Sequence, residues 1–358
     1  MTNRFTETRA ARARRRRVVM VVSSVAVLGV AAWPAMSFFE IPPFTDKGEP
    51  VSYGRVGRAV SGKPADTRTL LPTGPEAAFT NAETLGDGSK IGVVTLEGGK
   101  SGFKGKVWVW APKEYTDDPK YAKSGFPVMI ALPGGPGYES NYWMGRPGGF
   151  SLQESVAEWF HEGTSRPFLL AMPVLNPGPG DKGIYWDGSD IPGQPKMGTW
   201  LTEDVPDLMR ANFRTLKSRD GWAFMGSSTG GFAGLKAVLK HPDKFKAVIA
   251  NGPDVVPDSP LWNGHEKEKA ENNPEVLAKQ LIDTKGPDVY LSFQVGTREN
   301  AATMRSVKNF MRSYGRGPVH TKLWEIPGGS HNGATYGANM AAPMKWISDH
   351  LEGPPLSP

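Results

Sequence analysis

The sequence predicts an α/β fold in which helices cover both faces of a mostly parallel sheet. From about residue 90 onward, short apolar or alternating runs typical of strands are separated by segments whose apolar residues recur at helical spacing. This alternation is typical of parallel strands joined by crossover helices. We expect strands at 90–97, 106–111, 127–132, 168–172, 222–225, 247–250, 289–295 and 322–326. We expect helices around 152–160, 201–213, 232–239 and 340–351.

The regular pattern defines one predicted domain, 86–354, in a chain of 358 residues. The stretch before it, 40–85, is rich in Pro, Gly, Thr and charged residues, which indicates a linker and an irregular lead-in. Two long connections, 173–198 and 252–287, lack a strand pattern. Long connections in such folds are usually lids or walls of a ligand pocket.

The positive charge of the chain is confined to its first residues. Residues 1–17 contain seven arginines and one acid, Glu7, and this basic segment carries the whole formal net charge of +6. The charges of residues 18–358 therefore balance to zero. A neutral body offers no basic surface for phosphates, so we expect no nucleic-acid partner.

An apolar run follows the arginines directly. Residues 18–39 are apolar apart from three serines, and their 22 residues are enough to cross a bilayer. A basic segment before such a run is typical of either an export signal or a membrane anchor. Both alternatives place the body outside the cytoplasmic membrane, because the positive residues stay inside. The chain has no cysteine, which excludes disulfides and thiolate chemistry.

Residues 226–230 form the motif that carries chemistry. They read Gly-Ser-Ser-Thr-Gly, a G-x-S-x-G pattern between the expected strand 222–225 and a helix that begins near Phe232. This is the nucleophile elbow of the α/β-hydrolase fold, where the serine stands on a tight turn and its neighbours two residues away must be small. The register of the motif selects Ser228 rather than Ser227 as the nucleophile. The sequence therefore predicts an α/β-hydrolase fold and a serine-dependent enzyme.

A serine nucleophile needs a base and an acid, which follow it along the chain in this fold. Of the six histidines, His331 lies in a small, glycine-rich loop after the last expected strand, and we predict that it is the general base. Glu299 follows the expected strand 289–295, and we predict that it holds the imidazole in the required tautomer. Asp254, after the expected strand 247–250, is the alternative acid.

An oxyanion hole needs two N–H donors. We expect the first donor at Thr229, which follows the nucleophile at the start of the helix. The second is expected in the glycine-rich turn 132–137 that follows a buried strand. In this turn Gly135 is the first choice and Gly134 the second.

These segments resemble the "putative esterase" family of α/β-hydrolases, which includes esterase D-like enzymes and the actinobacterial mycolyltransferases. The residues that carry the resemblance are 127–137, 226–231, 296–299 and 329–333. It extends over roughly 90–352 and implies the α/β-hydrolase fold, an acid at Glu299 and a second oxyanion donor at Gly135. The chain departs from the mycolyltransferases at Thr229, where they usually have methionine.

The predicted function is hydrolysis of a small-molecule or lipid carboxylic ester through an acyl-serine. Acyl transfer to a sugar or protein hydroxyl is the close alternative, because only the acceptor differs. A peptidase and a non-catalytic envelope module are further alternatives. The sequence contains no H-E-x-x-H zinc motif and no G-x-x-x-x-G-K-[ST] phosphate loop, so no metal or cofactor is expected. Asp181, Asp187 and Asp190 are expected to be solvated turn residues rather than calcium ligands.

Overall fold

The computed structural model describes residues 48–53, 64–178 and 185–357, all within the unit Asp46–Pro358. The predicted basic segment 1–17 and the apolar run 18–39 lie outside the described residues. Among the helices of the described part, none combines the length and apolarity that a membrane span requires.

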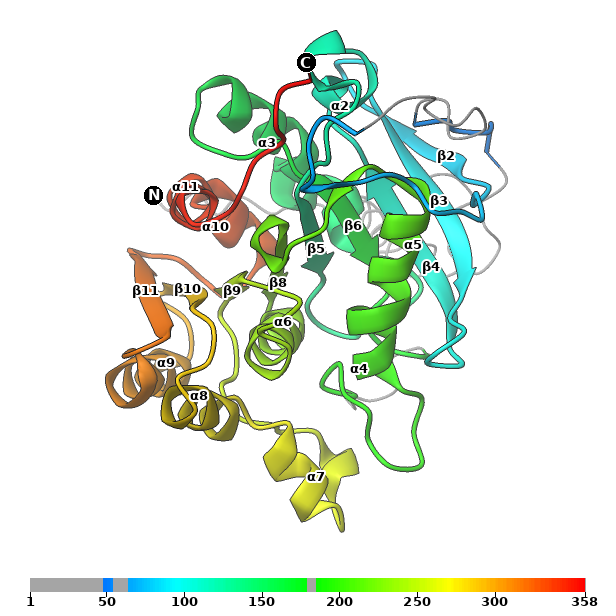
Figure 1. Ribbon diagram of the computed structural model, residues 1–358. Coiled ribbons are helices and arrows are strands. Elements are labelled where there is room, and N and C mark those ends of the chain that lie inside the picture. Colours follow the sequence, from blue (N-terminus) through cyan, green and yellow to red (C-terminus); the bar gives the residue numbers. More distant parts are fainter. Residues whose placement is uncertain (1–47, 54–63, 179–184, 358) are drawn as a thin grey trace, which may run out of the picture. The chain divides into compact units, whose positions relative to one another are not determined.

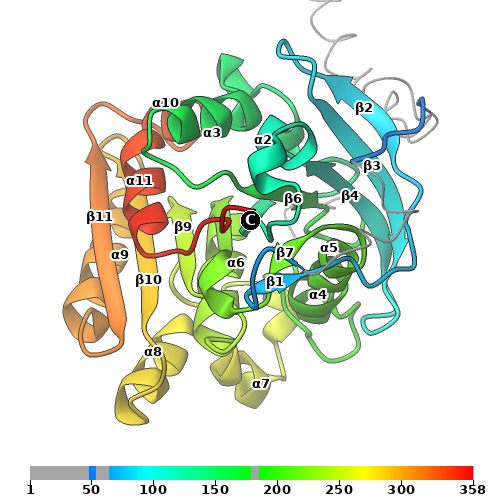
Figure 2. The same ribbon diagram turned by 45° about the horizontal axis from the view of Figure 1, so that its top comes forward.

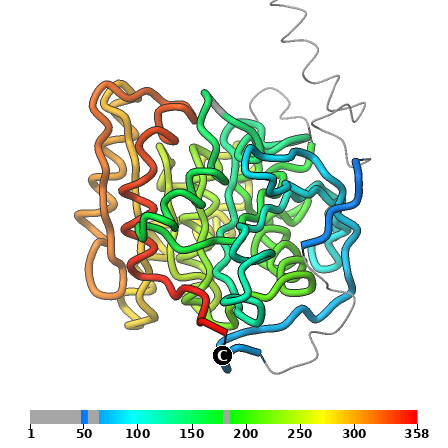
Figure 3. Tube along the Cα trace, turned by 90° about the horizontal axis from the view of Figure 1, so that it is seen from above, coloured from blue at the N-terminus to red at the C-terminus, as the bar shows by residue number. Residues whose placement is uncertain are grey.

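Within the described residues, nine strands form one sheet whose larger part is parallel. In order across the sheet, the strands are β11 (Val319–Ile326), β10 (Val289–Gly296), β9 (Ala247–Asn251), β8 (Trp222–Ser227), β5 (Val128–Leu132), β6 (Leu169–Pro173), β4 (Lys104–Trp110), β3 (Lys90–Glu97) and β2 (Thr80–Thr84). Neighbours are parallel from β11 to β6, whereas β4, β3 and β2 join antiparallel. The N-terminal and C-terminal strands therefore lie at opposite edges (Figure 3). A second, two-stranded sheet pairs β1 (Thr69–Leu70) with β7 (Thr215–Leu216).

Helices cover both faces of the large sheet (Figures 1 and 2). One face carries α3 (Leu152–His161), α10 (Gly333–Ala338) and α11 (Ala341–Asp349). The other face carries α5 (Val205–Asn212), α6 (Thr229–Lys240), α8 (Pro274–Asp283) and α9 (Ala301–Tyr314). The shorter helices are α2 (Lys113–Thr116), α4 (Met197–Thr199) and α7 (Glu266–Glu271), and a π-helical turn, Trp200–Asp204, leads into α5. The predicted α/β architecture is confirmed.

The central strands are buried along their whole length. Every residue of β5, β6, β8 and β9 is buried, as expected for parallel strands covered on both faces. Their continuous apolar runs made them predictable from the sequence. Each expected strand and helix overlaps an observed one, and the ends differ by three residues or fewer when the π-helical turn Trp200–Asp204 is counted with α5.

The sequence pattern does not predict β2, α8 or α9. β2 lies in the stretch expected to be an irregular lead-in, and it is an edge strand whose half-exposed residues show no apolar alternation. α8 lies in the connection 252–287, where Asn273 caps the helix and Pro274 opens it; this start signal is local and is not part of the apolar pattern. α9 buries only Val307 and Phe310, so its apolar stripe is weak.

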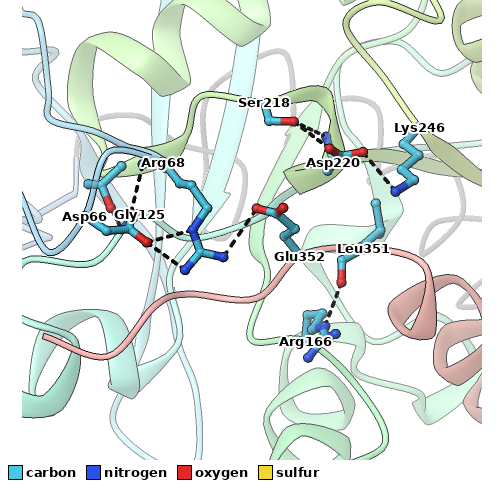
Figure 4. A network of polar contacts seen from close by, with 10 residues as sticks. Asp66, Arg68, Gly125, Arg166, Ser218, Asp220, Lys246, Leu351 and Glu352 are labelled. Carbon is cyan, nitrogen blue, oxygen red and sulfur yellow. Dashed lines mark hydrogen bonds and ion pairs between the residues drawn. The ribbon is translucent and has the colours of Figure 1, made fainter. Parts of the chain in front are cut away.

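A polar network fixes the C-terminal segment at the end of the sheet where β8 begins (Figure 4). Glu352 N–H donates to the carbonyl of Asp220, which lies two residues before the start of β8, at 2.8 Å. Arg166 Nε donates to the carbonyl of Leu351 at 3.0 Å, and Arg68 lies 3.7 Å from the Glu352 carboxylate. Since Ser228 follows β8 at its other end, this network stabilises the fold away from the predicted nucleophile.

A buried lysine in α6 joins both long connections to that helix. Lys236 Nζ donates to the carbonyls of Asp187 and Gly188, at 2.7 and 2.6 Å, and to Ser189 Oγ. The Asp187 carboxylate in turn accepts from Trp262 Nε1 at 2.7 Å. The expectation that Asp187 is a solvated turn acid is wrong, because its residue is 1% exposed and its polar atoms bond within the protein. Asp190 is exposed, and Asp181 lies outside the described residues.

We expect Lys236→Met to lower the free energy of unfolding by roughly 2–5 kcal/mol, because three buried oxygen acceptors lose their donor. Chemical denaturation measures this change. Lys279→Met is the matched control, because Lys279 forms an exposed ion pair with Asp283, and its loss is expected to cost less than about 1 kcal/mol. Equal effects of the two substitutions would contradict the role given to Lys236.

Candidate active site

Ser228 occupies a sharp turn between the last residue of β8 and the first residue of α6. Its backbone has φ 53° and ψ −121°, a positive φ that residues other than glycine rarely adopt. The turn is possible because the residues two positions before and after Ser228 are glycines without side chains. A Cβ at Gly226 would overlap the Gly230 carbonyl, and a Cβ at Gly230 would overlap the carbonyl oxygen of Pro133. The G-x-S-x-G pattern therefore lies in its expected strand–turn–helix setting.

Two backbone hydrogen bonds fix this turn. Ser228 N–H donates to the carbonyl of Asn251, the last residue of β9, at 2.7 Å. Ser228 C=O accepts from Phe232 N–H at 2.9 Å and so opens α6. The first N–H groups of a helix have no acceptor within it and carry partial positive charge. Thr229 N–H is the first of these and is adjacent to the serine.

His331 and Glu299 meet above the ends of neighbouring strands. Glu299 follows β10 and His331 follows β11, and Glu299 Oε2 lies 2.8 Å from His331 Nδ1. The Glu299 side chain is fully buried, and its Oε1 accepts from Gly296 N–H at 2.5 Å. The His331 side chain is 45% exposed. Of the two candidate acids, Glu299 is the one bonded to His331, whereas Asp254 interacts with it only electrostatically.

The pKa values of this pair move in opposite directions. The hydrogen bond to Glu299 raises the pKa of His331 above its ordinary value, although burial opposes the rise. Burial acts to raise the pKa of Glu299, but hydrogen bonds from His331, Gly296 N–H and Tyr336 outweigh it and lower that pKa. Glu299 is therefore a carboxylate that stabilises a positive charge on the imidazole.

Gly252 connects the serine turn with the His331–Glu299 pair. It follows Asn251, the acceptor of Ser228 N–H, and has φ +51°. A Cβ on Gly252 would lie 2.7 Å from Glu299 Oε2 and 2.8 Å from His331 Nδ1. The strand end that holds the serine thus passes directly against the pair. Among the described residues, no hydrogen bond joins Ser228 to His331, and such bonds are often long before substrate binds.

The glycine-rich turn after β5 lies against the serine. A Cβ on Gly134 would lie 2.9 Å from the Ser227 carbonyl oxygen and 3.3 Å from Ser228 Cβ, so a glycine is needed for the backbone to come this close. Gly134 N–H donates to Tyr142 Oη at 3.2 Å and is therefore engaged. Gly135 has φ +66°, and no atom lies within 4 Å of where its Cβ would be. This arrangement favours Gly135 over Gly134 as a donor to a ligand.

Two tyrosines at the site escaped the sequence analysis. Tyr142 begins a 3₁₀ turn, Tyr142–Met144, and burial raises its pKa. Tyr336 lies in α10, with its hydroxyl 2.9 Å from His331 Nδ1. Nothing in the local pattern marks either residue, since aromatic side chains near glycine-rich loops are common in cores. Over the part of the chain that the structure describes, no group of three or more His, Asp or Glu is placed to hold a metal ion.

A protein-family model described as "Putative esterase" matches residues 103–343 of this chain. An uncharacterized protein of Corynebacterium glutamicum is 23% identical over 305 residues, which span 80% of this chain and 68% of that protein. The MPT51 antigen of Mycobacterium leprae is 30% identical over 119 residues, 32% of this chain and 38% of that protein.

Solved structures share the fold at low sequence identity. A ferulic acid esterase superposes with a TM-score of 0.59 at 18% identity, covering 74% of this chain and 99% of that one. An S-formylglutathione hydrolase from Agrobacterium tumefaciens gives 0.57 at 19% identity, covering 74% and 96%. The predicted α/β-hydrolase fold is confirmed by these likenesses. Since the family model spans most of the chain, the protein belongs to the "Putative esterase" family of α/β-hydrolases, which are serine hydrolases.

Proposed function

We propose that the protein is a serine-dependent carboxylic-ester hydrolase with Ser228 as nucleophile, His331 as general base and Glu299 as the acid that orients it. The observation that carries this proposal is the Glu299–His331 pair at the strand end that also holds the strained Ser228 turn. Strained backbone of this kind is retained where function requires it. Membership of an esterase family supports the same reaction.

The proposed reaction has two halves. Ser228 Oγ attacks the ester carbonyl while His331 Nε2 accepts its proton, and Glu299 stabilises the imidazolium that forms. Thr229 N–H and Gly135 N–H donate to the oxyanion. The alcohol leaves with the proton from His331, and water then hydrolyses the acyl-serine with His331 again acting as base. The 45% exposure of the His331 side chain supports access for that water.

We also propose that the reaction takes place outside the cytoplasmic membrane. The support is the arginine-rich segment 1–17 followed by the apolar run 18–39, an order typical of an export signal or a membrane anchor. The net charge of residues 18–358 is zero, so electrostatic attraction to nucleic acid gives no reason to place this part of the chain in the cytoplasm.

Ser228→Ala is expected to lower kcat for p-nitrophenyl ester hydrolysis by roughly 10⁴-fold or more, because the attacking oxygen is lost. Release of nitrophenol from esters between acetate and palmitate measures this and also reports the preferred acyl length. Ser227→Ala is the matched control, since Ser227 ends β8 beside the nucleophile and is expected to retain activity within about tenfold. Similar rates for Ser228→Ala and the wild type would refute the assignment.

The activity is expected to fall as the pH drops through the raised pKa of His331, because only the neutral imidazole accepts a proton. Glu299→Gln removes the charge that raises this pKa, so the acidic limb of the kcat/KM profile should move to lower pH while the plateau falls by up to about 10⁴-fold. Asp254→Asn is the control and should move the limb less, with the plateau retained. If Asp254→Asn lowered the kcat/KM plateau more than Glu299→Gln does, Asp254 rather than Glu299 would be the acid of the site.

The full chain, expressed in a bacterial host, is expected in the membrane fraction or, after cleavage, in the exported fraction. Residues 40–358 alone should remain in the cytoplasm, because they lack the apolar run. Cell fractionation with protease added outside the cytoplasmic membrane measures both. A full-length chain found in the cytoplasm would contradict the proposed location.

A further inference from the structure

The Nδ1 atom of His331 has two oxygen neighbours rather than one. His331 Nδ1 lies 2.8 Å from Glu299 Oε2 and 2.9 Å from Tyr336 Oη. The Tyr336 ring stands nearly perpendicular to the imidazole, at 87° with centroids 5.8 Å apart. Tyr336 is 1% exposed, so its hydroxyl finds its partners inside the protein.

The number of protons on His331, Glu299 and Tyr336 determines the direction of each hydrogen bond among them. A neutral imidazole carries one proton, an ionised carboxylate only accepts, and a phenol both donates and accepts. Burial and the charge of Glu299 raise the pKa of Tyr336, so its hydroxyl keeps its proton. Since an ionised carboxylate only accepts, we assign the hydroxyl proton to Glu299, whose pKa this contact lowers, and the hydroxyl lone pair to Nδ1 of His331, 2.9 Å away. Both contacts favour a proton on Nδ1, which leaves Nε2 as the basic nitrogen.

The backbone around the hydroxyl is shaped to admit it. A Cβ on Gly252 would overlap Tyr336 Oη, so the hydroxyl fits only because this residue is glycine. Asn332 caps α10 by accepting from Thr335 N–H at 2.8 Å, which fixes the start of the helix that carries Tyr336. One short loop and helix therefore deliver both the imidazole and the phenol to Glu299.

Glu299 needs such a partner more than an aspartate would. Its side chain has one more rotatable bond, and it is fully buried. Gly296 N–H holds one carboxylate oxygen, Oε1. Without the Tyr336 hydroxyl, Oε2 would be held by the His331 imidazole alone. The charge of that imidazole changes during the reaction, so it is a variable partner.

We infer that Tyr336 is a positioning residue of this site, which holds the Glu299 carboxylate and the Nδ1–H tautomer of His331 so that Nε2 is available to Ser228. This inference rests on the proposed function for its catalytic consequence. The tautomer itself is a property of the unliganded protein, so it can be tested separately.

The first test is ¹⁵N NMR of the His331 imidazole at a pH above its pKa. The wild type should show the proton on Nδ1, and Tyr336→Phe should show an increased fraction of the Nε2–H tautomer. Tyr142→Phe is the matched control: this partly buried tyrosine bonds to Gly134, so its substitution should leave the tautomer unchanged. An unchanged tautomer in Tyr336→Phe with an unchanged melting temperature would overturn the inference, whether or not the protein hydrolyses esters.

The second test is a double-mutant cycle in ester hydrolysis. Tyr336→Phe should lower kcat by roughly 10- to 100-fold at unchanged KM, as expected for the loss of one charge-assisted hydrogen bond. In the Glu299→Gln background the same substitution should change kcat by less than about twofold, because its target is already gone. Multiplicative losses would overturn the role through Glu299. If Ser228→Ala were as active as the wild type, the proposed function would fail, while the tautomer result would still decide the inference.

Discussion

The peptide at Ser228 turns from β8 into α6 with φ 53° and ψ −121°, a conformation that costs on the order of 1–3 kcal/mol. Several neighbours must compensate for that cost. Glycines at 226 and 230 remove the side chains that would collide with the turn, and the carbonyl of Asn251 accepts the Ser228 N–H. These contacts bring β8, β9 and the start of α6 into one rigid unit. The glycine-rich turn after β5 can then approach to within contact of the serine side chain.

The end of β9 also lies against the charged groups of the site. Gly252, directly after β9, lies against Glu299, His331 and Tyr336, and each of these would be displaced by a side chain there. Burial by itself would keep Glu299 protonated, yet three donors surround its two oxygens and lower its pKa. The carboxylate can therefore remain charged although its side chain is buried. This buried charge is what makes His331 a stronger base than an isolated histidine.

The sequence was most informative where local and global requirements coincide. The strands β5, β8 and β9 are buried on both faces, so their apolar runs identify them, and the elbow motif has one register that fits a strand and a helix. Chain order narrowed the acid to Glu299 or Asp254, but only three-dimensional proximity shows which one bonds to His331. β2 was missed because an edge strand needs no apolar face. Tyr336 was missed because its role depends on Gly252 and Glu299, which are remote in sequence.

The proposed reaction requires that Ser228 becomes acylated. The most direct measurement is mass spectrometry of the protein quenched with acid during turnover of a p-nitrophenyl ester, followed by proteolysis and peptide sequencing. We expect the peptide containing residues 226–231 to carry the mass of the acyl group on Ser228. Turnover with no acyl adduct there, or an adduct on another residue that kinetics show to be competent, would contradict it.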